Sequence, residues 1–529
     1  MKSPEIRGIL RFVGTAKAIE RRAFQVNGFC RKNLESRKAK IAKRLERRNF
    51  PDQTEPVLRG GNVRYELAGR QLGARHGGAA AIHEMVRRLG LPGLLNGTVK
   101  LLKAHLPYSE SDHILSLAFN VLAGGTSLED LELLRQDEGF LDALGAERIP
   151  DPTTAGDFLR RFSVEYIIVL MEVINDVRET VWREKAKRDP SFFDEALIEV
   201  DGTISPTLGE CKGGMDISYK GLWGYAPLIV TLANTREVLY IVNRPGNTPS
   251  SQDAARWIDL ALERVCKCFK KVTVRGDTDF SLTAHLDKWD ARARFVLGYD
   301  ACPNLVEIAE GLGQKAWSAL ERPAKWAVKT RERPRPANVK DEIVRERGYT
   351  NLRLVSEEAA EFDYSPGKCK KTYRMVVVRK NISVEKGEYS FLPEVRYFFY
   401  ITNRRDITKE DVIFSANDRC DQENIIAQLK SGVRALHAPV DNLTSNWAYM
   451  VVASLAWTFK AWYGLLVPDK KESQAVVRME YKKFLHHFIA LPCQVVKGAR
   501  RLVIRVLSYT AHLKTFFETF DAIRRLHPT

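Results

Sequence analysis

The chain has 529 residues, of which 44% are hydrophobic and 28% are charged, so its composition excludes an intrinsically disordered protein. Its length allows roughly two to four domains. The formal net charge is +17, and residues 1–50 alone hold 15 Lys or Arg against 4 Glu, a net charge of +11. This basic excess indicates a polyanionic partner, and the lack of an amphipathic anchor or lipidation motif favours nucleic acid over a membrane surface.

The cysteines and the longest apolar run bear on where the protein works. Eight cysteines are scattered along the chain and only Cys266 and Cys268 are close, so no CxxC pair or His-rich stretch indicates a zinc site. This usage is typical of a reduced intracellular protein, and the first residues contain no apolar signal core. Residues 447–467 are long enough to span a bilayer, but they contain Lys460 and several Trp and Tyr side chains. A buried core helix in a cytoplasmic protein is therefore expected.

The first third of the chain is predicted to be basic and then helical. Residues 1–60 form a basic arm, in which 31–48 have the composition of a helix that orders on DNA. A solvated helix or a flexible tail are the alternatives. Residues 61–190 have apolar residues at i, i+3, i+4 spacing, broken by Gly and Pro, which predicts a small helical domain before the main fold. We expect this domain to bind DNA.

The pattern changes over residues 191–302, the first part of the predicted core. Apolar strands joined by short turns are followed by helix, strand, helix and strand, which describes a mixed α/β sheet with covering helices. That order is the order of a ribonuclease-H-like fold. The predicted strands are 196–204, 227–235, 238–246, 270–280 and 294–300, and the predicted helices are 250–269 and 281–291.

Residues 303–394 are predicted to interrupt this core as a strand-rich insertion. Within it, the stretch 322–336 has six Lys or Arg and one Glu around Trp326. This composition fits either a DNA-contacting segment, with Trp326 as a stacking group, or a linker with a stray Trp.

Residues 395–467 are the predicted second part of the core. They begin with an apolar strand over 395–403, and a helix is expected to start at Thr408 with Asp411 as its capping partner. Residues 468–529 are predicted to be a C-terminal helical region that serves packing, dimerisation or DNA contact.

The stretch "NDRCDQENIIAQLKSG", residues 417–432, contains the pattern R-x3-E-x6-K at Arg419, Glu423 and Lys430. At ~3.6 residues per turn these positions fall on one helical face. Apolar Ile425, Ile426 and Leu429 would anchor the helix. An isolated pattern of this kind also fits a salt-bridge ladder on a solvated helix.

Two acids follow apolar strands of the predicted core. Asp201 follows "ALIEV" and Asp277 follows "VTVRG". Each alone fits a strand-end turn, but a buried carboxylate is costly unless it is paired or binds a metal. Because the first and fourth strands are predicted neighbours, both acids would meet at one sheet edge with Glu423 as a third ligand. Asp279 is the rival of Asp277, since residues two apart on a strand face the same way.

Three carboxylates suit hard cations such as Mg²⁺ or Mn²⁺. Two such ions ~4 Å apart activate a water or 3′-hydroxyl and stabilise the leaving oxygen of a phosphodiester displacement. The cations that flank the glutamate would then hold phosphates.

At these residues the chain resembles the DDE transposases of the IS4-like superfamily, and most of all the IS1380 group of bacterial insertion sequences. The segments "EVDGT" and "RGDTDF" resemble the motifs of the two aspartates, and "NDRCDQENIIAQLK" resembles the signature Y-x2-R-x3-E-x6-K. The segments "DPTTAGDFLRRF" and "NRPGNTPSSQDA" resemble flanking segments of the group. The similarity covers about residues 70–465.

The resemblance implies roles for individual residues. Asp201, Asp277 and Glu423 match the catalytic, metal-binding triad, which would hold two Mg²⁺ or Mn²⁺ ions. Arg419 and Lys430 match the DNA-binding cations of the signature. The signature tyrosine has no counterpart, since Ala416 stands there. In the insertion, the residues that would contact DNA are Lys325, Trp326, Lys329 and Arg331.

The resemblance also implies a reaction and partners. The enzyme would cleave transposon ends and join them to target DNA, by a cut-and-paste route through a hairpin on the element's end. Its partners would be double-stranded DNA with terminal inverted repeats and a second copy of the chain, in a bacterial cytoplasm beside the nucleoid. A domesticated or inactive DNA-binding relative, or another two-metal nuclease on the same fold, are the alternatives.

Overall fold

The computed structural model describes residues 32–40, 72–322 except 104 and 106, 342, 343, 346, 347, 350–498 except 387, 388 and 419, and 501–527 except 508. The chain divides into two compact units. The first contains residues 1–97, 102–155 and 462–529, and the second contains 98–101 and 156–461.

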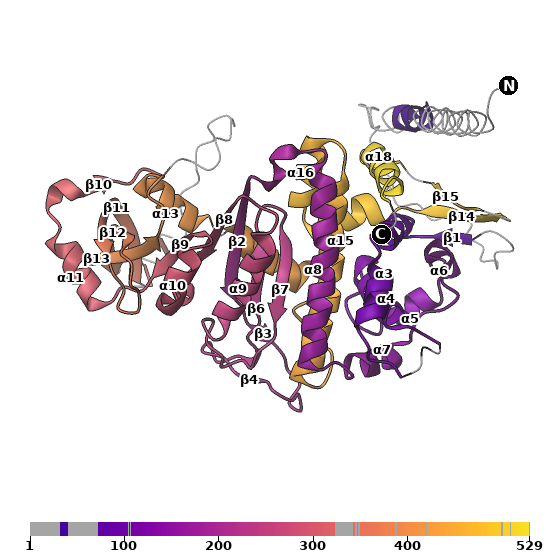
Figure 1. Cartoon of the computed structure of the whole chain (residues 1–529), viewed down its shortest axis with the longest axis horizontal. Helices are drawn as coiled ribbons and strands as arrows, with labels where there is room; N and C mark the ends of the chain where they lie inside the picture. Colours follow the sequence, from indigo (N-terminus) through magenta and orange to yellow (C-terminus); the bar gives the residue numbers. More distant parts are fainter. Residues whose placement is uncertain are drawn as a thin grey trace, which may run out of the picture. The chain divides into compact units, whose positions relative to one another are not determined.

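A mixed sheet forms the centre of the second unit (Figure 1). Among the described residues it has nine strands, in the order β10-β11-β12-β13-β9-β8-β2-β6-β7. Strand β2 pairs antiparallel with β6 and parallel with β8, and β8 pairs parallel with β9. The prediction that the first and fourth strands of the core are neighbours is thereby confirmed. The core strands are β2 (Glu195–Gly202), β6 (Leu228–Leu232), β7 (Glu237–Val242), β8 (Lys271–Gly276) and β9 (Arg294–Tyr299).

The core strands form where aliphatic and β-branched residues run together. Every residue of β6 and β7 is buried, as expected for strands that helices cover. Helix α9 (Ala254–Val265) contacts β2, β6 and β7, and helix α8 (Val164–Ala186) contacts β7. The predicted sheet with covering helices is therefore present.

A buried ion pair fastens α8 to β7. Arg178 Nε donates to Glu237 Oε1 at 2.9 Å, and Arg178 Nη2 donates to the Val238 carbonyl at 2.7 Å. Trp182 Nε1 donates to Glu237 Oε2 at 2.7 Å. The two charged side chains are 1% and 0% exposed. Hydrogen bonds offset the desolvation of such a pair, and here both carboxylate oxygens accept them, while Arg178 Nη1 has no partner among the described residues.

A meander of long strands extends the sheet beyond β9. The strands β11 (Thr350–Tyr364), β12 (Tyr373–Lys386) and β13 (Tyr389–Thr402) pair antiparallel in turn, and the short β10 (Ser318–Ala319) pairs antiparallel with β11. Strand β13 then pairs antiparallel with β9, from Phe399 opposite Tyr299 to Thr402 opposite Val296. The strands expected in the insertion therefore continue the core sheet.

Helix α15 (Leu443–Leu466) contains nearly all of the apolar run 447–467, whose sequence is long enough for a membrane span but was expected to form a buried core helix. Lys460 is 0% exposed, and its Nζ lies 4.0 Å from the centre of the Trp457 ring. Burial lowers the pKa of Lys460 well below its usual range. In the part of the chain that the structure describes, no helix combines the length and apolar character needed to cross a membrane.

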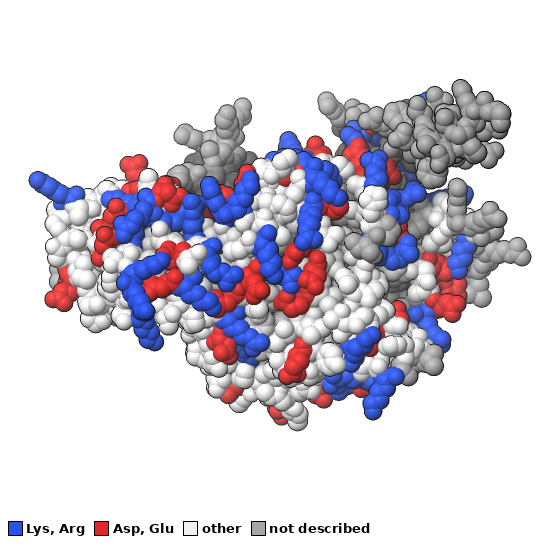
Figure 2. Space-filling model, viewed as in Figure 1, with Lys and Arg blue, Asp and Glu red and all other residues white. Residues whose placement is uncertain are grey.

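Charges of both signs share the visible surface. In Figure 2, Lys and Arg side chains alternate with Asp and Glu over this face and do not gather into one basic patch.

Of the predicted basic helix, residues 32–40 are helical, and Arg37 Nη1 donates to the carbonyls of Val506 and Leu507 at 3.0 and 3.2 Å. The rest of that helix lies outside the described residues.

The first unit combines helices with a small sheet in the order β1-β14-β15. The prediction of helix throughout 468–529 is wrong for β14 and β15, where Val and Ile residues pair as a hairpin. The short strand β1 joins this sheet from the start of the predicted helical domain. The elements of this unit include β1 (Leu72–Ala74), α2 (Ala79–Arg88), α4 (Glu110–Leu122), α6 (Glu138–Leu144), α16 (Lys470–Arg478), β14 (Cys493–Gly498), β15 (Arg501–Val506) and α18 (Leu513–Arg524).

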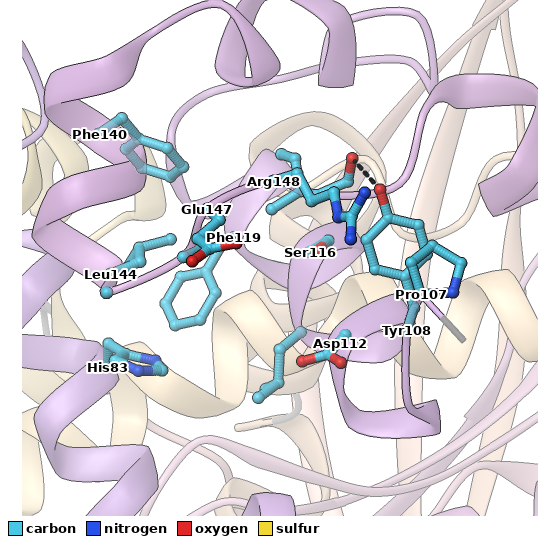
Figure 3. A pocket seen from close by; sticks show the side chains of 14 residues that line it. His83, Pro107, Tyr108, Asp112, Ser116, Phe119, Phe140, Leu144, Glu147 and Arg148 are labelled. Carbon is cyan, nitrogen blue, oxygen red and sulfur yellow. Dashed lines mark hydrogen bonds between the residues drawn. The ribbon is translucent and has the colours of Figure 1, made fainter. Parts of the chain in front are cut away.

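A cavity of about 400 Å³ lies in the first unit (Figure 3). Its lining includes His83, Asp112, Phe119 and Arg148, together with Tyr108, whose hydroxyl donates to the Ile149 carbonyl at 3.0 Å. The residues that line it do not include Asp201, Asp277 or Glu423. This cavity is therefore separate from the residues for which the sequence predicts chemistry.

We expect Glu237→Ala to lower the free energy of unfolding by about 3–5 kcal/mol, because it leaves the guanidinium of Arg178 buried without its carboxylate. Chemical unfolding followed by fluorescence measures this loss. The control is Glu184→Ala, which removes the partner of the exposed Lys187 and should cost less than about 1 kcal/mol. Equal losses from the two variants would contradict the assignment of the pair to the core.

Candidate active site

Asp201 and Asp277 lie at the same edge of the sheet. Strands β2 and β8 run parallel with Glu199 opposite Arg275, an offset of 76 residues. The pairing ends two positions before Asp201 and Asp277, and the same offset extended by two residues would bring the two acids level, at the carboxyl ends of strands ~4.8 Å apart. Both aspartates are half-buried. The register thus puts the ends of the two strands at one edge of the sheet, and a shared site of the two acids stays a prediction.

The backbone separates Asp277 from its rival Asp279. Strand β8 ends at Gly276, and Thr278–Phe280 form a 3₁₀ turn with Asp277 at its N-cap. The Asp279 N–H donates to Asp277 Oδ1 at 3.1 Å, and Asp279 itself is exposed. The expectation that the two acids share a strand face is therefore wrong, because the strand has already ended.

Two glycines make room for this turn. A Cβ atom on Gly276 would lie 2.9 Å from the Cβ of Phe280, and one on Gly298 would lie 2.8 Å from the backbone nitrogen of Thr278. Real Cβ atoms almost never approach this closely. Because Gly298 belongs to β9, the turn that carries Asp277 is packed directly against the next strand.

A buried ion pair lies two residues before the aspartates on both strands. Arg275 Nε donates to Glu199 Oε1 at 2.9 Å, and Arg275 Nη2 also contacts this oxygen. The same guanidinium donates from Nη1 to the Ser415 carbonyl at 2.7 Å and from Nη2 to the Asp418 carbonyl at 2.9 Å. These carbonyls end helix α13 (Lys409–Asn417), where backbone acceptors lack helical partners. Arg275 therefore connects both strands to the segment that leads into the glutamate helix.

Glu423 lies on helix α14 (Cys420–Ala427), which contacts β2. The neighbouring Gln422 is buried, and its Nε2 donates at 3.3 Å to the carbonyl of Ile229, the residue opposite Asp201. Ile425, Ile426 and Leu429 are buried as predicted. Glu423 itself is exposed.

Lys430 does not continue the same α-helix. Helix α14 ends at Ala427, and Gln428–Gly432 form a π-helical turn in which the Val433 N–H donates to the Gln428 carbonyl at 2.9 Å. The expectation of one unbroken helical face is therefore wrong at Lys430, because a wider turn changes the direction of the side chain. Burial lowers the pKa of Lys430, Lys220 lowers it further, and Asp201 raises it. Lys430 thus lies within electrostatic range of the first aspartate.

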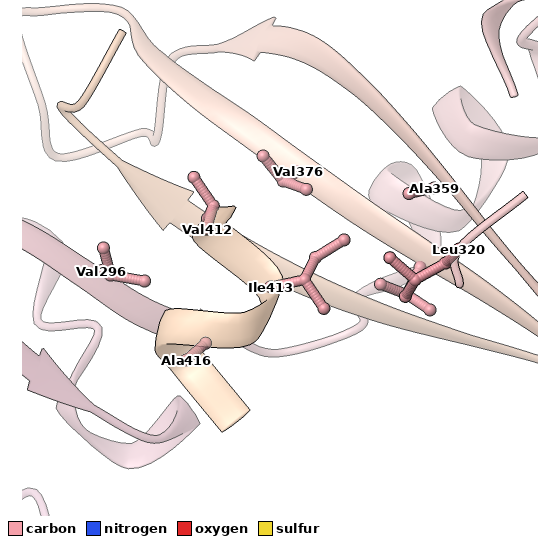
Figure 4. Packing of buried hydrophobic residues seen from close by; sticks show 8 residues of the cluster. Val296, Leu320, Ala359, Val376, Val412, Ile413 and Ala416 are labelled. Carbon is pink, nitrogen blue, oxygen red and sulfur yellow. The ribbon is translucent and has the colours of Figure 1, made fainter. Parts of the chain in front are cut away.

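Ala416, at the position of the signature tyrosine, is 7% exposed and packs into a hydrophobic cluster (Figure 4). Figure 4 shows it on α13 with Val412 and Ile413, beside Val296 of β9 and Val376 of β12. Thr408 caps this helix and forms the predicted capping box with Asp411. A larger side chain at 416 would enter the core, so this position serves packing.

The described residues include no group of three or more His, Cys, Asp or Glu side chains placed to hold a metal ion. The oxygen donors of Asp201 and Asp277 suit a hard cation and share one edge, but Glu423 does not complete a cluster with them. Five predicted DNA-binding residues lie outside the described part of the chain: Arg419, Lys325, Trp326, Lys329 and Arg331.

Sequence reasoning missed Glu199, Arg275 and Lys220. For the first two a signal was present, since each is a charge within an otherwise apolar strand, and such a charge requires a partner. Lys220 had no such signal, because its proximity to Lys430 depends on residues far apart in the chain.

Comparison with known proteins places these features in a family. A family model described as transposase DDE domain, group 1, matches residues 55–528. A cryo-EM structure of the piggyBac transposase synaptic complex with hairpin DNA resembles this chain with a TM-score of 0.36 and 9% identity, over 87% of this chain and 88% of the other. At this identity and TM-score, the similarity supports no conclusion about fold or function. No curated protein sequence matches the chain. Because the family model spans most of its length, the chain belongs to the DDE transposase family.

Proposed function

We propose that this transposase cleaves phosphodiester bonds at transposon ends and joins them to target DNA by a cut-and-paste route. The observation that supports the proposal is the parallel pairing of β2 with β8 up to Glu199 opposite Arg275, two residues before Asp201 and Asp277, so that both acids follow at the carboxyl ends of neighbouring strands. The order β7-β6-β2-β8-β9, with β2 antiparallel to β6 and parallel to β8, supports a ribonuclease-H-like core. Within the transposase family, the motifs and their spacing support membership of the IS1380 group.

In this proposal Asp201, Asp277 and Glu423 hold two Mg²⁺ or Mn²⁺ ions. Such ions supply an activated water or 3′-hydroxyl and stabilise the leaving oxygen. The chain contributes one carboxylate on β2, one in the turn that follows β8, and a third on a helix that packs against β2. The proposal requires Glu423 to join the two aspartates in the complex with DNA.

Lys430 and Arg419 are proposed to hold the phosphates of the strand that is cut. Lys430 is half-buried, and burial lowers its pKa, with a further lowering from Lys220 and an opposite effect from Asp201. A phosphate at this place would restore a counter-charge to both lysines. Paired transposon ends would require two copies of the chain, and the insertion and the helical region 61–190 are the proposed DNA-binding parts.

The first test is cleavage of a duplex that carries the element's own ends. We expect Mg²⁺-dependent cleavage by the wild type and its loss in EDTA. The isosteric variants Asp201→Asn, Asp277→Asn and Glu423→Gln should each reduce cleavage at least about a hundredfold, because each removes an anionic metal ligand. Asp279→Asn is the matched control and should retain activity. Hairpin-ended products on a denaturing gel would identify the cut-and-paste route.

The alternative function is DNA binding without cleavage. It is favoured by one observation, that the described residues contain no assembled three-carboxylate group. A folded wild type that binds the ends and leaves them uncut in Mg²⁺ and in Mn²⁺ would establish this alternative and remove the catalytic roles of the three acids.

A second test concerns Arg275 as a positioning residue. We expect Arg275→Lys to reduce cleavage about 10- to 100-fold and to raise the Mg²⁺ concentration needed for half-maximal cleavage, because a single ammonium cannot bond Glu199 and both α13 carbonyls together. Binding of the ends, measured by fluorescence polarisation, should change little.

The control is Arg264→Lys, which alters another arginine with several carboxylate partners, on α9. Both variants should lose thermal stability to a similar degree. If Arg264→Lys impairs cleavage and its Mg²⁺ dependence as strongly as Arg275→Lys does, Arg275 has only a general structural role.

A further inference from the structure

Between β2 and β6 the chain forms a small sheet that the sequence did not predict. It consists of β3 (Ser205–Pro206), β5 (Trp223–Tyr225) and β4 (Asp216–Ile217), in that order. Since β2 ends at Gly202, one residue after Asp201, this sheet begins at the edge that carries the predicted acids. Figure 1 shows β3 and β4 beyond the end of β6.

The small sheet is firmly attached to the second unit. Ser205 Oγ donates to the Leu436 carbonyl at 2.8 Å, and Lys212 Nζ contacts the Ala438 carbonyl. Tyr225 is buried, and its hydroxyl donates to the Gly213 carbonyl at 3.0 Å. Leu436 and Ala438 lie four and six residues after Gly432, where the π-helical turn with Lys430 ends, so the sheet is attached near that lysine.

The tip of this sheet is an ordered turn. The Ser218 N–H donates to the Leu222 carbonyl at 2.8 Å, and the Leu222 N–H donates to Ser218 Oγ at 3.1 Å. The Gly221 N–H donates to the Ser218 carbonyl at 2.8 Å, and Gly221 has φ +73°, a conformation that favours glycine. The side chains on the turn are therefore presented in defined positions.

These side chains are aromatic and exposed. Tyr219 is 86% exposed and Trp223 is 54% exposed, beside the partly exposed Ile217 and Leu222. Ile217 and Trp223 are paired across β4 and β5, so exposed apolar side chains adjoin here, and contiguous exposed apolar surface marks interaction sites. We call Ile217, Tyr219, Lys220, Leu222 and Trp223 the aromatic tip.

The positive charges beside the aromatic tip favour an anionic partner. Lys220 Nζ lies 5.4 Å from the centre of the Tyr219 ring. The connection that carries Lys220 leaves β2 next to Asp201 and is bonded to the carbonyls of Leu436 and Ala438, a few residues after Lys430. In agreement with this placement, the charge of Lys220 contributes to the lowered pKa of Lys430, which the charge of Asp201 raises. Two neighbouring cations with exposed rings beside them match a phosphate backbone with accessible base faces. In duplex DNA the base faces are stacked on each other, so the matching form is an unpaired strand.

We propose that the aromatic tip binds unpaired nucleotides of the DNA strand at the predicted cleavage edge, with bases stacked on Tyr219 and Trp223 and phosphates on Lys220 and Lys430. This inference rests on the proposed function, since it places DNA at that edge. It adds a binding element between β2 and β6, distinct from the signature helix and from the insertion.

The experiment measures the affinity of the full-length protein for two fluorescein-labelled element ends, one blunt and one with a three-nucleotide single-stranded overhang. Ca²⁺ replaces Mg²⁺ to prevent cleavage. The wild type should bind the overhang about tenfold more tightly than the blunt end. The double variant Tyr219→Ala with Trp223→Ala should lose this preference and keep its affinity for the blunt end.

Two controls separate stacking from a general apolar effect. The variant Tyr219→Phe with Trp223→Phe keeps both rings and should keep the preference. Leu208→Ala removes a fully exposed apolar side chain of the same connection and should have no effect. Equal affinity of the wild type for both ends, or loss of the preference in Leu208→Ala, would overturn the proposal.

The outcome is distinguishable from that of the proposed function. Cleavage by a wild type that shows no preference for the overhang would overturn the role of the tip and leave the transposase proposal intact. A preference that depends on the two rings, in a protein that does not cleave, would support the tip alone. A change of oligomeric state in the double variant without DNA, seen by analytical ultracentrifugation, would assign the surface to a second copy of the chain and overturn the proposal.

Discussion

The buried ion pair between Glu199 and Arg275 is the interaction on which the geometry of the candidate active site depends. The two residues face each other across β2 and β8, two positions before Asp201 and Asp277. A slip of one strand by one residue would turn its charge to the opposite face of the sheet and separate it from its partner. Separation of a buried pair is costly, so the pair fixes the register of the two strands that lead to the aspartates.

The same guanidinium extends this constraint to a third element. Because it also binds the Ser415 and Asp418 carbonyls, the C-terminus of α13 cannot shift against the sheet without breaking hydrogen bonds to a buried charge. Helix α14 begins two residues after Asp418 and carries Glu423. One side chain therefore relates the strands of both aspartates to the helix of the glutamate.

The features that the sequence predicted well have local causes. The runs of β-branched residues before Asp201 and Asp277 specify strands, and the Thr408–Asp411 capping box specifies a helix start. The features that it predicted poorly depend on contacts between distant segments. The 3₁₀ turn at Asp277 depends on Gly298 of another strand, and the hairpin of β14 and β15 joins β1, more than four hundred residues earlier.

Charges within apolar segments were the signal that sequence reasoning used least. Glu199, Arg275, Arg178, Glu237 and Lys460 all interrupt apolar or amphipathic runs, and all are nearly fully buried. The first four form the two ion pairs that fasten β2 to β8 and α8 to β7. A charge of this kind predicts that a partner exists, but the choice of partner depends on the tertiary fold.

The pairing of β13 with β9 has a consequence for the length of the segment between them. The chain leaves the core after Tyr299 and returns at Phe399, which lies directly opposite Tyr299. The two ends of the intervening segment are thus already joined by the sheet, and the entropy of closing a loop grows only slowly with its length. The fold can therefore accommodate segments of very different length at this point without disturbing the strands that lead to Asp201 and Asp277.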